Sequence, residues 1–238
     1  LARIVKAKAR RGCAAFAKIA MSALVELGTH APLRAALGLD KEGEHSLSAT
    51  LLEHLPPGIL LILDRLYGQA PMLAQLQAKC RVQDEQHFLV RVRMKLGVKI
   101  LRLLEDGSAM VEVGLRDKAK PRKVLQTLSV REVRGRVWKR SEKKWVDVRL
   151  WTSLGVGQAG AKELIALYAR RWEQEIFYKE MKVEMRSRPY LQSHTPLTAR
   201  QEIAALILAY AVLVDYRLEA AKVGEVGVLR ISFLKTFE

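Results

Sequence analysis

A continuous apolar run in the first third of the chain is the clearest strand signal. Residues 59–63 (ILLIL) are all aliphatic, and the run ends abruptly at Asp64-Arg65. Such a run is typical of a central strand that is buried on both faces. A helix is predicted to follow at about residues 71–78. The pattern therefore predicts a strand–helix unit with Asp64 just beyond the carboxyl end of its strand.

The segments before this unit are less distinct. Residues 16–28 favour a buried strand ending at Gly28, although frequent alanine leaves a helix open. Residues 45–55 predict a short amphipathic helix, which Pro56-Pro57-Gly58 would stop. Residues 1–12 carry five cations and no acid, which indicates a basic arm or loop.

The pattern changes to alternating β-like segments between residues 87 and 152. Asp106-Gly107, placed between two apolar runs, predicts a hairpin turn. A long helix is predicted from Ala161 to Met185, and a second, apolar helix from about Thr198 to Ala221. This order predicts a mixed α/β chain in three segments: residues 1–84, a β-rich segment at 85–150, and residues 151–238.

The charge of the chain is strongly positive. Its 41 Lys and Arg outnumber 25 Asp and Glu, which gives a net charge of +16 and a pI near 10.1. A field of this sign attracts polyanions, of which nucleic acids are the commonest. A ribosome-associated or merely basic protein is the alternative. Candidate phosphate contacts in the β-rich segment are Arg91, Arg93, Lys95 and Lys99, although each also suits a solvated strand face.

Cysteine and histidine give no sign of a metal or disulfide site. Cys13 and Cys80 are far apart and lack CxxC spacing, which fits a reducing cytoplasm. The five histidines, among them His30, are scattered and are expected to be surface or capping residues. The apolar stretch from Ile203 to Val214 is too short to span a bilayer, and no export signal is evident. We therefore predict a cytoplasmic protein without a membrane partner.

Asp64 is the first candidate for chemistry. Open α/β sheets bind ligands just beyond the carboxyl ends of their strands, where a carboxylate can hold a divalent metal ion. The alternative is that Asp64 caps the next helix or closes a turn.

The long predicted helix carries a second set of polar residues. Tyr168, Arg171, Glu175 and Lys182 fall within an arc of roughly 60° if each residue turns the helix by about 100°. On such a face Glu175 could bind a metal ion, while Arg171 and Lys182 hold phosphates. A solvated face with an ordinary Arg171–Glu175 pair explains the pattern equally well.

The spacing Y-x2-R-x3-E-x6-K resembles the YREK signature of the insertion-sequence-four (IS4-like) family of DDE transposases, with Trp172 after the arginine as is usual there. Further blocks resemble that family in their usual order: LVELGTHA (24–31), GE (43–44), the strand into Asp64-Arg65, HFLVRV (87–92), LLEDGS (103–108), LWTSL (150–154), QEIAALILAY (201–210) and ISF (231–233).

The resemblance implies an RNase H-like fold of the retroviral-integrase type, with an inserted antiparallel β subdomain. It implies that Asp64 is the second Asp and Glu175 the Glu of a catalytic DDE triad, both binding metal. It also implies two Mg²⁺ ions about 4 Å apart, which Mn²⁺ can replace, for phosphoryl transfer. The implied partners are the terminal inverted repeats and the target in double-stranded DNA, with a homodimer formed on the DNA. The residues expected to contact DNA are Tyr168, Arg171, Lys182, Trp172 and Arg65.

The chain departs from the family pattern at the first Asp of the triad. No Asp precedes Asp40, and neither Asp40 nor Glu26 matches the place of the catalytic residue. The expectation is therefore a chain that is cut at both ends, catalytically inactive and poorly soluble because a sheet edge is exposed. The alternative function is that of a non-catalytic DNA-binding protein derived from a transposase.

Overall fold

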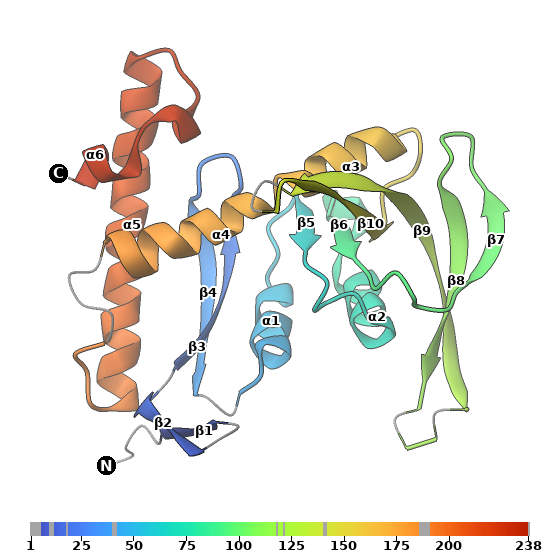
Figure 1. Cartoon of the computed structure of the whole chain (residues 1–238), viewed down its shortest axis with the longest axis horizontal. Helices are drawn as coiled ribbons and strands as arrows, with labels where there is room; N and C mark the ends of the chain where they lie inside the picture. Colours follow the sequence, from blue (N-terminus) through green and yellow to red (C-terminus); the bar gives the residue numbers. More distant parts are fainter. Residues whose placement is uncertain are drawn as a thin grey trace. The chain divides into compact units, whose positions relative to one another are not determined.

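The computed structural model describes residues 6–9, 12–17, 19–39, 42–117, 119–120, 122–139, 142–185 and 191–237. Part of the predicted basic arm at 1–12, and Asp40, lie outside these residues. The chain divides into two compact units, and each is described by itself (Figure 1). Unit 1 comprises Leu1–Leu51 and Trp172–Glu238, and unit 2 comprises Leu52–Arg171. The fold is mixed α/β, as predicted. The two compact units have other boundaries than the three segments predicted from the sequence.

Unit 2 is built on a six-stranded mixed sheet in the order β5-β6-β10-β9-β8-β7 (Figure 1). β5 and β6 are parallel, and the other neighbouring pairs are antiparallel. Apolar side chains of β6, β9, β10 and α3 form its core, among them Leu89, Val133, Leu150 and Leu164. The bounds of its elements are β5 Leu60–Leu63, α2 Ala70–Lys79, a 3₁₀ turn Val82–Asp84, β6 His87–Arg91, β7 Lys99–Leu103, β8 Ala109–Arg116, β9 Val124–Lys139, β10 Lys144–Thr152 and α3 Ala161–Ala169.

The strand before Asp64 is present, but the prediction that it is central and buried on both faces is wrong. In the described part of the chain β5 pairs only with β6, so it is an edge strand. Of its four residues only Leu61 is buried. A run of aliphatic residues favours a strand sheltered from water, but it contains no information on which neighbours the strand hydrogen-bonds.

The predicted hairpin at Asp106-Gly107 is confirmed. β7 and β8 pair antiparallel on either side of it, and the Leu104 amide donates to the Ser108 carbonyl at 2.8 Å. Gly107 has φ 80°, a left-handed conformation that favours glycine. The helix predicted after β5 is also confirmed as α2.

Unit 1 combines segments from both ends of the chain. Where one strand was predicted at 16–28, the structure has β2 Gly12–Ala17 and β3 Ile19–Val25, so the ambiguity with a helix is resolved in favour of strands. β3 forms an antiparallel hairpin with β4, and β2 pairs with β1 in a separate ribbon. The other bounds are β1 Lys6–Ala9, β4 Pro32–Leu39, α1 Glu44–Leu52, α4 Trp172–Lys179, a π-helical turn Glu180–Glu184, α5 Pro196–Val223, a 3₁₀ turn Val228–Arg230 and α6 Phe233–Phe237.

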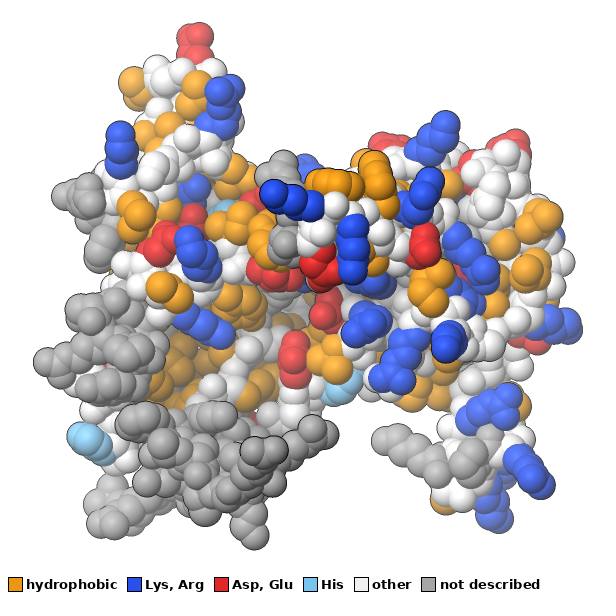
Figure 2. All heavy atoms as spheres, in the orientation of Figure 1, with side chains coloured by type: hydrophobic (Ala, Val, Ile, Leu, Met, Phe, Trp, Pro, Cys, Tyr) orange, Lys and Arg blue, Asp and Glu red, His pale blue; other side chains and the backbone are white. Residues whose placement is uncertain are grey.

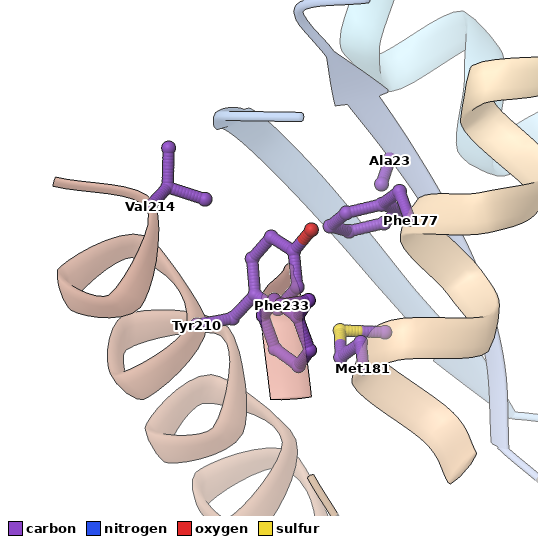
Figure 3. Packing of buried hydrophobic residues seen from close by; sticks show 6 residues of the cluster. All are labelled: Ala23, Phe177, Met181, Tyr210, Val214 and Phe233. Atoms are coloured by element: carbon purple, nitrogen blue, oxygen red, sulfur yellow. The ribbon is translucent and has the colours of Figure 1, made fainter. Parts of the chain in front are cut away.

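The core of unit 1 is an aromatic cluster between α4, α5 and α6 (Figure 3). The Phe177 and Tyr210 rings meet edge-on with centroids 5.0 Å apart, and the Phe233 ring stacks on Tyr210 at 5.3 Å. Phe177 and Tyr210 are fully buried, and Met181 is nearly so. This cluster packs against Phe177 of α4 and Met181 of the π-helical turn that follows it.

α5 is long and apolar enough to cross a membrane by length and composition alone, a test that core helices of soluble proteins also pass. The apolar helix predicted from about Thr198 to Ala221 is confirmed as α5, which has 28 residues. One face of α5 packs on the core of unit 1 through Tyr210 and Val214. Its buried Arg217 forms an ion pair with Glu180.

The single long helix predicted from Ala161 to Met185 is wrong. The structure contains α3, a turn at Arg170-Arg171, α4 and then the π-helical turn. At the turn the Arg170 amide donates to the Leu167 carbonyl and the Arg171 amide to the Tyr168 carbonyl, both at 3.0 Å. These i→i+3 bonds tighten the last turn of α3 and interrupt the helical register. The interval between Tyr168 and Lys182 therefore does not follow one straight helical face.

Candidate active site

Asp64 lies at the carboxyl end of β5 and is half-buried. Its Oδ1 accepts a hydrogen bond from the Leu66 amide at 2.6 Å, and its carbonyl accepts from the Tyr67 amide at 3.2 Å. Asp64 thus closes a turn, as the alternative prediction had it. Because a carboxylate has two oxygens with about four acceptor sites, this role is compatible with metal binding.

A close backbone contact fixes the Asp64 turn against the neighbouring strand. A Cβ atom at Gly68 would lie 2.1 Å from the carbonyl oxygen of Arg91, so only glycine fits there. The turn therefore rests directly on the end of β6, the strand that carries Arg91.

Tyr168 and three charged groups form a cluster in unit 2. The Tyr168 side chain is 4% exposed on the last turn of α3. Burial raises the pKa of its phenol, the charges of Arg171 and Arg91 lower it, and the charge of Asp64 raises it. A hydrogen bond also joins the Tyr168 and Arg91 side chains. Unit 2 therefore brings together Asp64, Tyr168 and Arg171, with Arg91 as a fourth member; Arg65, next to Asp64, is exposed.

Trp172, Glu175 and Lys182 belong to unit 1. Glu175 and Trp172 are exposed on α4, and Lys182 is exposed on the π-helical turn with its Nζ 4.4 Å from the centre of the Tyr178 ring. Asp64 and Glu175 thus lie in different units. Within the described ranges, no three His, Cys, Asp or Glu side chains are grouped so as to hold a metal ion.

The turn that begins α3 depends on a charged pair inside unit 2. Asp106 accepts hydrogen bonds from the Arg131 guanidinium and, at 2.8 Å, from the Ala161 amide at the start of α3. Arg131, 3% exposed, also donates to the carbonyls of Leu154 and Ala159. Burial acts to raise the pKa of Asp106, but the hydrogen bonds from Ser108 and the charge of Arg131 outweigh it, and the pKa falls to about 2. These contacts anchor the helix that carries Tyr168.

A pair of exposed tryptophans was not singled out from the sequence. Trp138 on β9 and Trp145 on β10 are opposite each other in the register, with ring centroids 5.6 Å apart. Their side chains are 48% and 60% exposed, and exposed Arg136 and Lys144 lie on the same two strands. Figure 2 shows Lys and Arg side chains gathered over unit 2 on the visible face. The mirrored order Trp138-Lys139 and Lys144-Trp145 is the signal that could have indicated this pair.

His30 was predicted to be a surface or capping residue, and this is wrong. It is 2% exposed in the turn between β3 and β4, with φ 66°. Its Nδ1 lies 3.0 Å from an Oε of Glu180, and its Nε2 lies 3.0 Å from an Oε of Glu173. Glu180 also accepts from the Tyr210 hydroxyl at 2.5 Å and from Arg217 Nη1 at 3.4 Å. No spacing in the sequence connects His30 with carboxylates about 150 positions away.

The charged groups in this network shift one another's pKa values. Burial, the largest single influence, lowers the pKa of His30, but the hydrogen bonds and charges of Glu180 and Glu173 outweigh it, so the pKa is raised above 6.5. Burial also acts to raise the pKa of Glu180, but His30, Tyr210 and Arg217 outweigh it and lower that pKa. Both ring nitrogens lie 3.0 Å from carboxylate oxygens, an arrangement that favours the imidazolium form of His30.

We expect unit 1 to lose stability as the pH rises above 6.5, the ordinary pKa of histidine. The pKa of His30 is higher in the folded protein than in the unfolded chain, where it is near 6.5. Protonated His30 therefore stabilises the fold fully at pH values below 6.5, and this contribution is lost as the pH rises through the folded-state pKa. Imidazole NMR resonances should show His30 titrating above 6.5, and unfolding midpoints should fall over the same interval. His30→Asn should abolish this pH dependence. An His30 titration below 6.5 would contradict the expectation.

Comparison with known proteins agrees with this architecture. The transposase DDE domain family matches residues 3–212. The transposase InsG for insertion sequence element IS4 from Escherichia coli (strain K12) is 29% identical over 206 residues, which are 86% of this chain and 45% of that protein. The chain thus spans less than half the length of this relative. The mixed sheet with flanking helices is consistent with the RNase H-like fold expected of such domains. The chain therefore belongs to the transposase DDE domain family.

Proposed function

We propose that this chain acts in DNA transposition, binding double-stranded DNA for metal-dependent strand cleavage and transfer. The observation that carries the proposal is the cluster of unit 2, where Asp64 lies near Tyr168, Arg91 and Arg171 within a matched DDE domain. A carboxylate beside two guanidinium groups and a phenol can hold a metal ion next to a bound phosphate. The proposed substrates are the terminal inverted repeats and the target DNA, with a homodimer on the DNA in the bacterial nucleoid.

The side chains fit Mg²⁺ or Mn²⁺. Asp64 and Glu175 supply hard carboxylate oxygens. Oxygen ligands of this kind favour Mg²⁺ and Mn²⁺ over softer metals. We assign Asp64 and Glu175 as metal ligands. Two bound ions would activate the attacking oxygen and stabilise the leaving oxygen of a phosphodiester.

The remaining site residues are assigned to DNA. Arg171, Lys182 and Arg65 bind phosphates, and Tyr168 donates its hydroxyl to the DNA backbone while Arg91 holds the ring in place. The exposed Trp172 follows Arg171 in sequence and offers a stacking surface.

Metal binding tests the proposal. Asp64→Asn or Glu175→Gln is expected to weaken Mn²⁺ binding to the whole chain by about tenfold or more, since each removes a charged ligand. Titration of the Mn²⁺ electron paramagnetic resonance signal measures the affinity. Glu163→Gln, an exposed carboxylate on α3, is the matched control and should leave the affinity unchanged. Equal Mn²⁺ affinity in all four proteins would reject the proposed metal site.

These 238 residues supply two of the three acidic side chains of a DDE triad. We therefore propose that this chain by itself binds DNA, and that the strand cleavage and transfer proposed above need a third acidic side chain. If the chain binds DNA but Asp64→Asn and Glu175→Gln leave its Mn²⁺ affinity unchanged, the alternative of a non-catalytic DNA-binding protein is favoured.

A further inference from the structure

The two carboxylates bonded to His30 lie on one side of the helical stretch formed by α4 and the π-helical turn that follows it. Glu173 and Glu180 are seven residues apart, so they differ in direction by only about 20° on a helix. Phe177, between them in sequence, is fully buried on the same side. This side of α4 faces the interior of unit 1.

Glu175 lies on the other side of the same helix. It follows Glu173 by two residues, which turns its direction by about 200°. It is exposed, as is Lys179 one turn later. Any rotation of α4 about its own axis therefore changes the direction in which Glu175 points.

The His30 network is anchored at its far end. Glu180 is bonded to Tyr210 and Arg217 on α5, and Arg217 Nη2 donates to the Ile231 carbonyl at 3.2 Å. His30 itself is held in a tight turn, where its amide donates to the Glu26 carbonyl at 2.9 Å. The imidazole thus connects the first turn of α4, through Glu173, to a fixed point.

We propose that His30 is a positioning residue for Glu175, because its bridge between Glu173 and Glu180 fixes the rotation of α4 about its axis. The importance of Glu175 rests on the proposed function, whereas the rotation is a property of unit 1 alone. Apolar contacts such as those of Phe177 are non-directional, so they do not by themselves fix how far α4 is rotated about its axis. Two hydrogen bonds from one rigid imidazole ring are directional and do fix this rotation. A rotation of about 30° would move a side chain about 6 Å from the helix axis by roughly 3 Å. Metal ligands must lie within about 0.2 Å of ideal distances, so this displacement decides whether Glu175 can bind.

The distance between two spin labels in unit 1 tests the rotation directly. Lys179→Cys places one nitroxide on the Glu175 side of α4, and Glu219→Cys places the other on α5, both at side chains about two-thirds exposed. Cys13→Ser prevents labelling there. Burial raises the pKa of Cys80 to about 11, so that thiol reacts slowly. Double electron–electron resonance then gives the distance distribution.

Glu173→Ala is the decisive variant. Glu173 is only 26% exposed but lies at the end of the helix, and alanine retains helix propensity, so the fold should persist. We expect the distance distribution to shift or broaden by about 3 Å, the displacement of a roughly 30° rotation. His30→Asn should give the same result, since asparagine tolerates the left-handed φ of 66°. Gln174→Ala, the same kind of truncation one residue away and off the His30 side, should leave the distribution unchanged.

An unchanged distribution in folded Glu173→Ala overturns the inference, even if its unfolding midpoint falls, because the residue would then stabilise without positioning. The measurement contains no metal ion. Failure of the Mn²⁺ experiment would therefore reject the proposed metal site and leave the rotation of α4 as a separate, measured result.

Discussion

Raising the NaCl concentration from about 50 to about 200 mM is expected to weaken binding of duplex DNA to this chain by about 10³- to 10⁵-fold. The net charge of +16 and the Lys and Arg side chains gathered over unit 2 favour binding through phosphates. Each phosphate contact releases condensed counterions from the duplex, so about 6–10 contacts produce this range. Fluorescence anisotropy of a labelled duplex measures the affinity at each salt concentration.

Two variants of neighbouring residues test the role of charge in this experiment. Lys144→Gln should lower the slope of log affinity against log salt by about one. Trp145→Ala should leave that slope unchanged, because the substitution removes no charge. Affinity that hardly depends on salt would contradict a phosphate-binding surface.

Glu132→Ala is expected to lower the free energy of unfolding of unit 2 by about 3–5 kcal/mol, the cost of leaving a buried charge unpaired. Glu132 is 3% exposed and accepts hydrogen bonds from Arg149 Nε at 2.7 Å and Trp151 Nε1 at 3.0 Å. Arg149 is 1% exposed and its Nη1 donates only to backbone carbonyls, so no second carboxylate would replace Glu132. Urea unfolding followed by tryptophan fluorescence measures the loss.

The same sheet offers a matched control. Glu112 pairs with Lys99 at 3.8 Å near the surface, where the two side chains are 34% and 73% exposed, respectively. Glu112→Ala should cost about 0–1 kcal/mol, since exposed ion pairs contribute little. Equal losses for Glu132→Ala and Glu112→Ala would mean that burial of the pair does not matter.

Local sequence patterns predicted most elements because those elements depend on neighbouring residues. The aliphatic run before Asp64 predicts β5, and Asp106-Gly107 predicts the β7–β8 turn. Strand order depends instead on partners distant in sequence, so the edge position of β5 could not be deduced. The break between α3 and α4 was missed because residues 167–172 contain neither Gly nor Pro.

The candidate site was predictable only in part, for a similar reason. The motif spacing indicated Asp64, Tyr168 and Arg171, which unit 2 brings together. The sequence pattern predicts that Tyr168 and Glu175 share one face of a single helix. In the structure they belong to two separate helices, α3 and α4. The role of His30 depends on contacts with residues about 150 positions away, and no local pattern records such contacts.

Unit 2 is one uninterrupted stretch of chain, whereas unit 1 is composed of the two flanking stretches. On a ribosome, every residue of unit 2 emerges before Trp172 does. The β3–β4 hairpin is synthesised early but cannot complete its core until Phe177, Tyr210 and Phe233 have been synthesised. At about 5–20 residues per second, the interval between Ala23 and Phe233 is roughly 10–40 s. During translation the half that carries Asp64 can therefore fold first, while the early hairpin remains without its core and available to chaperones.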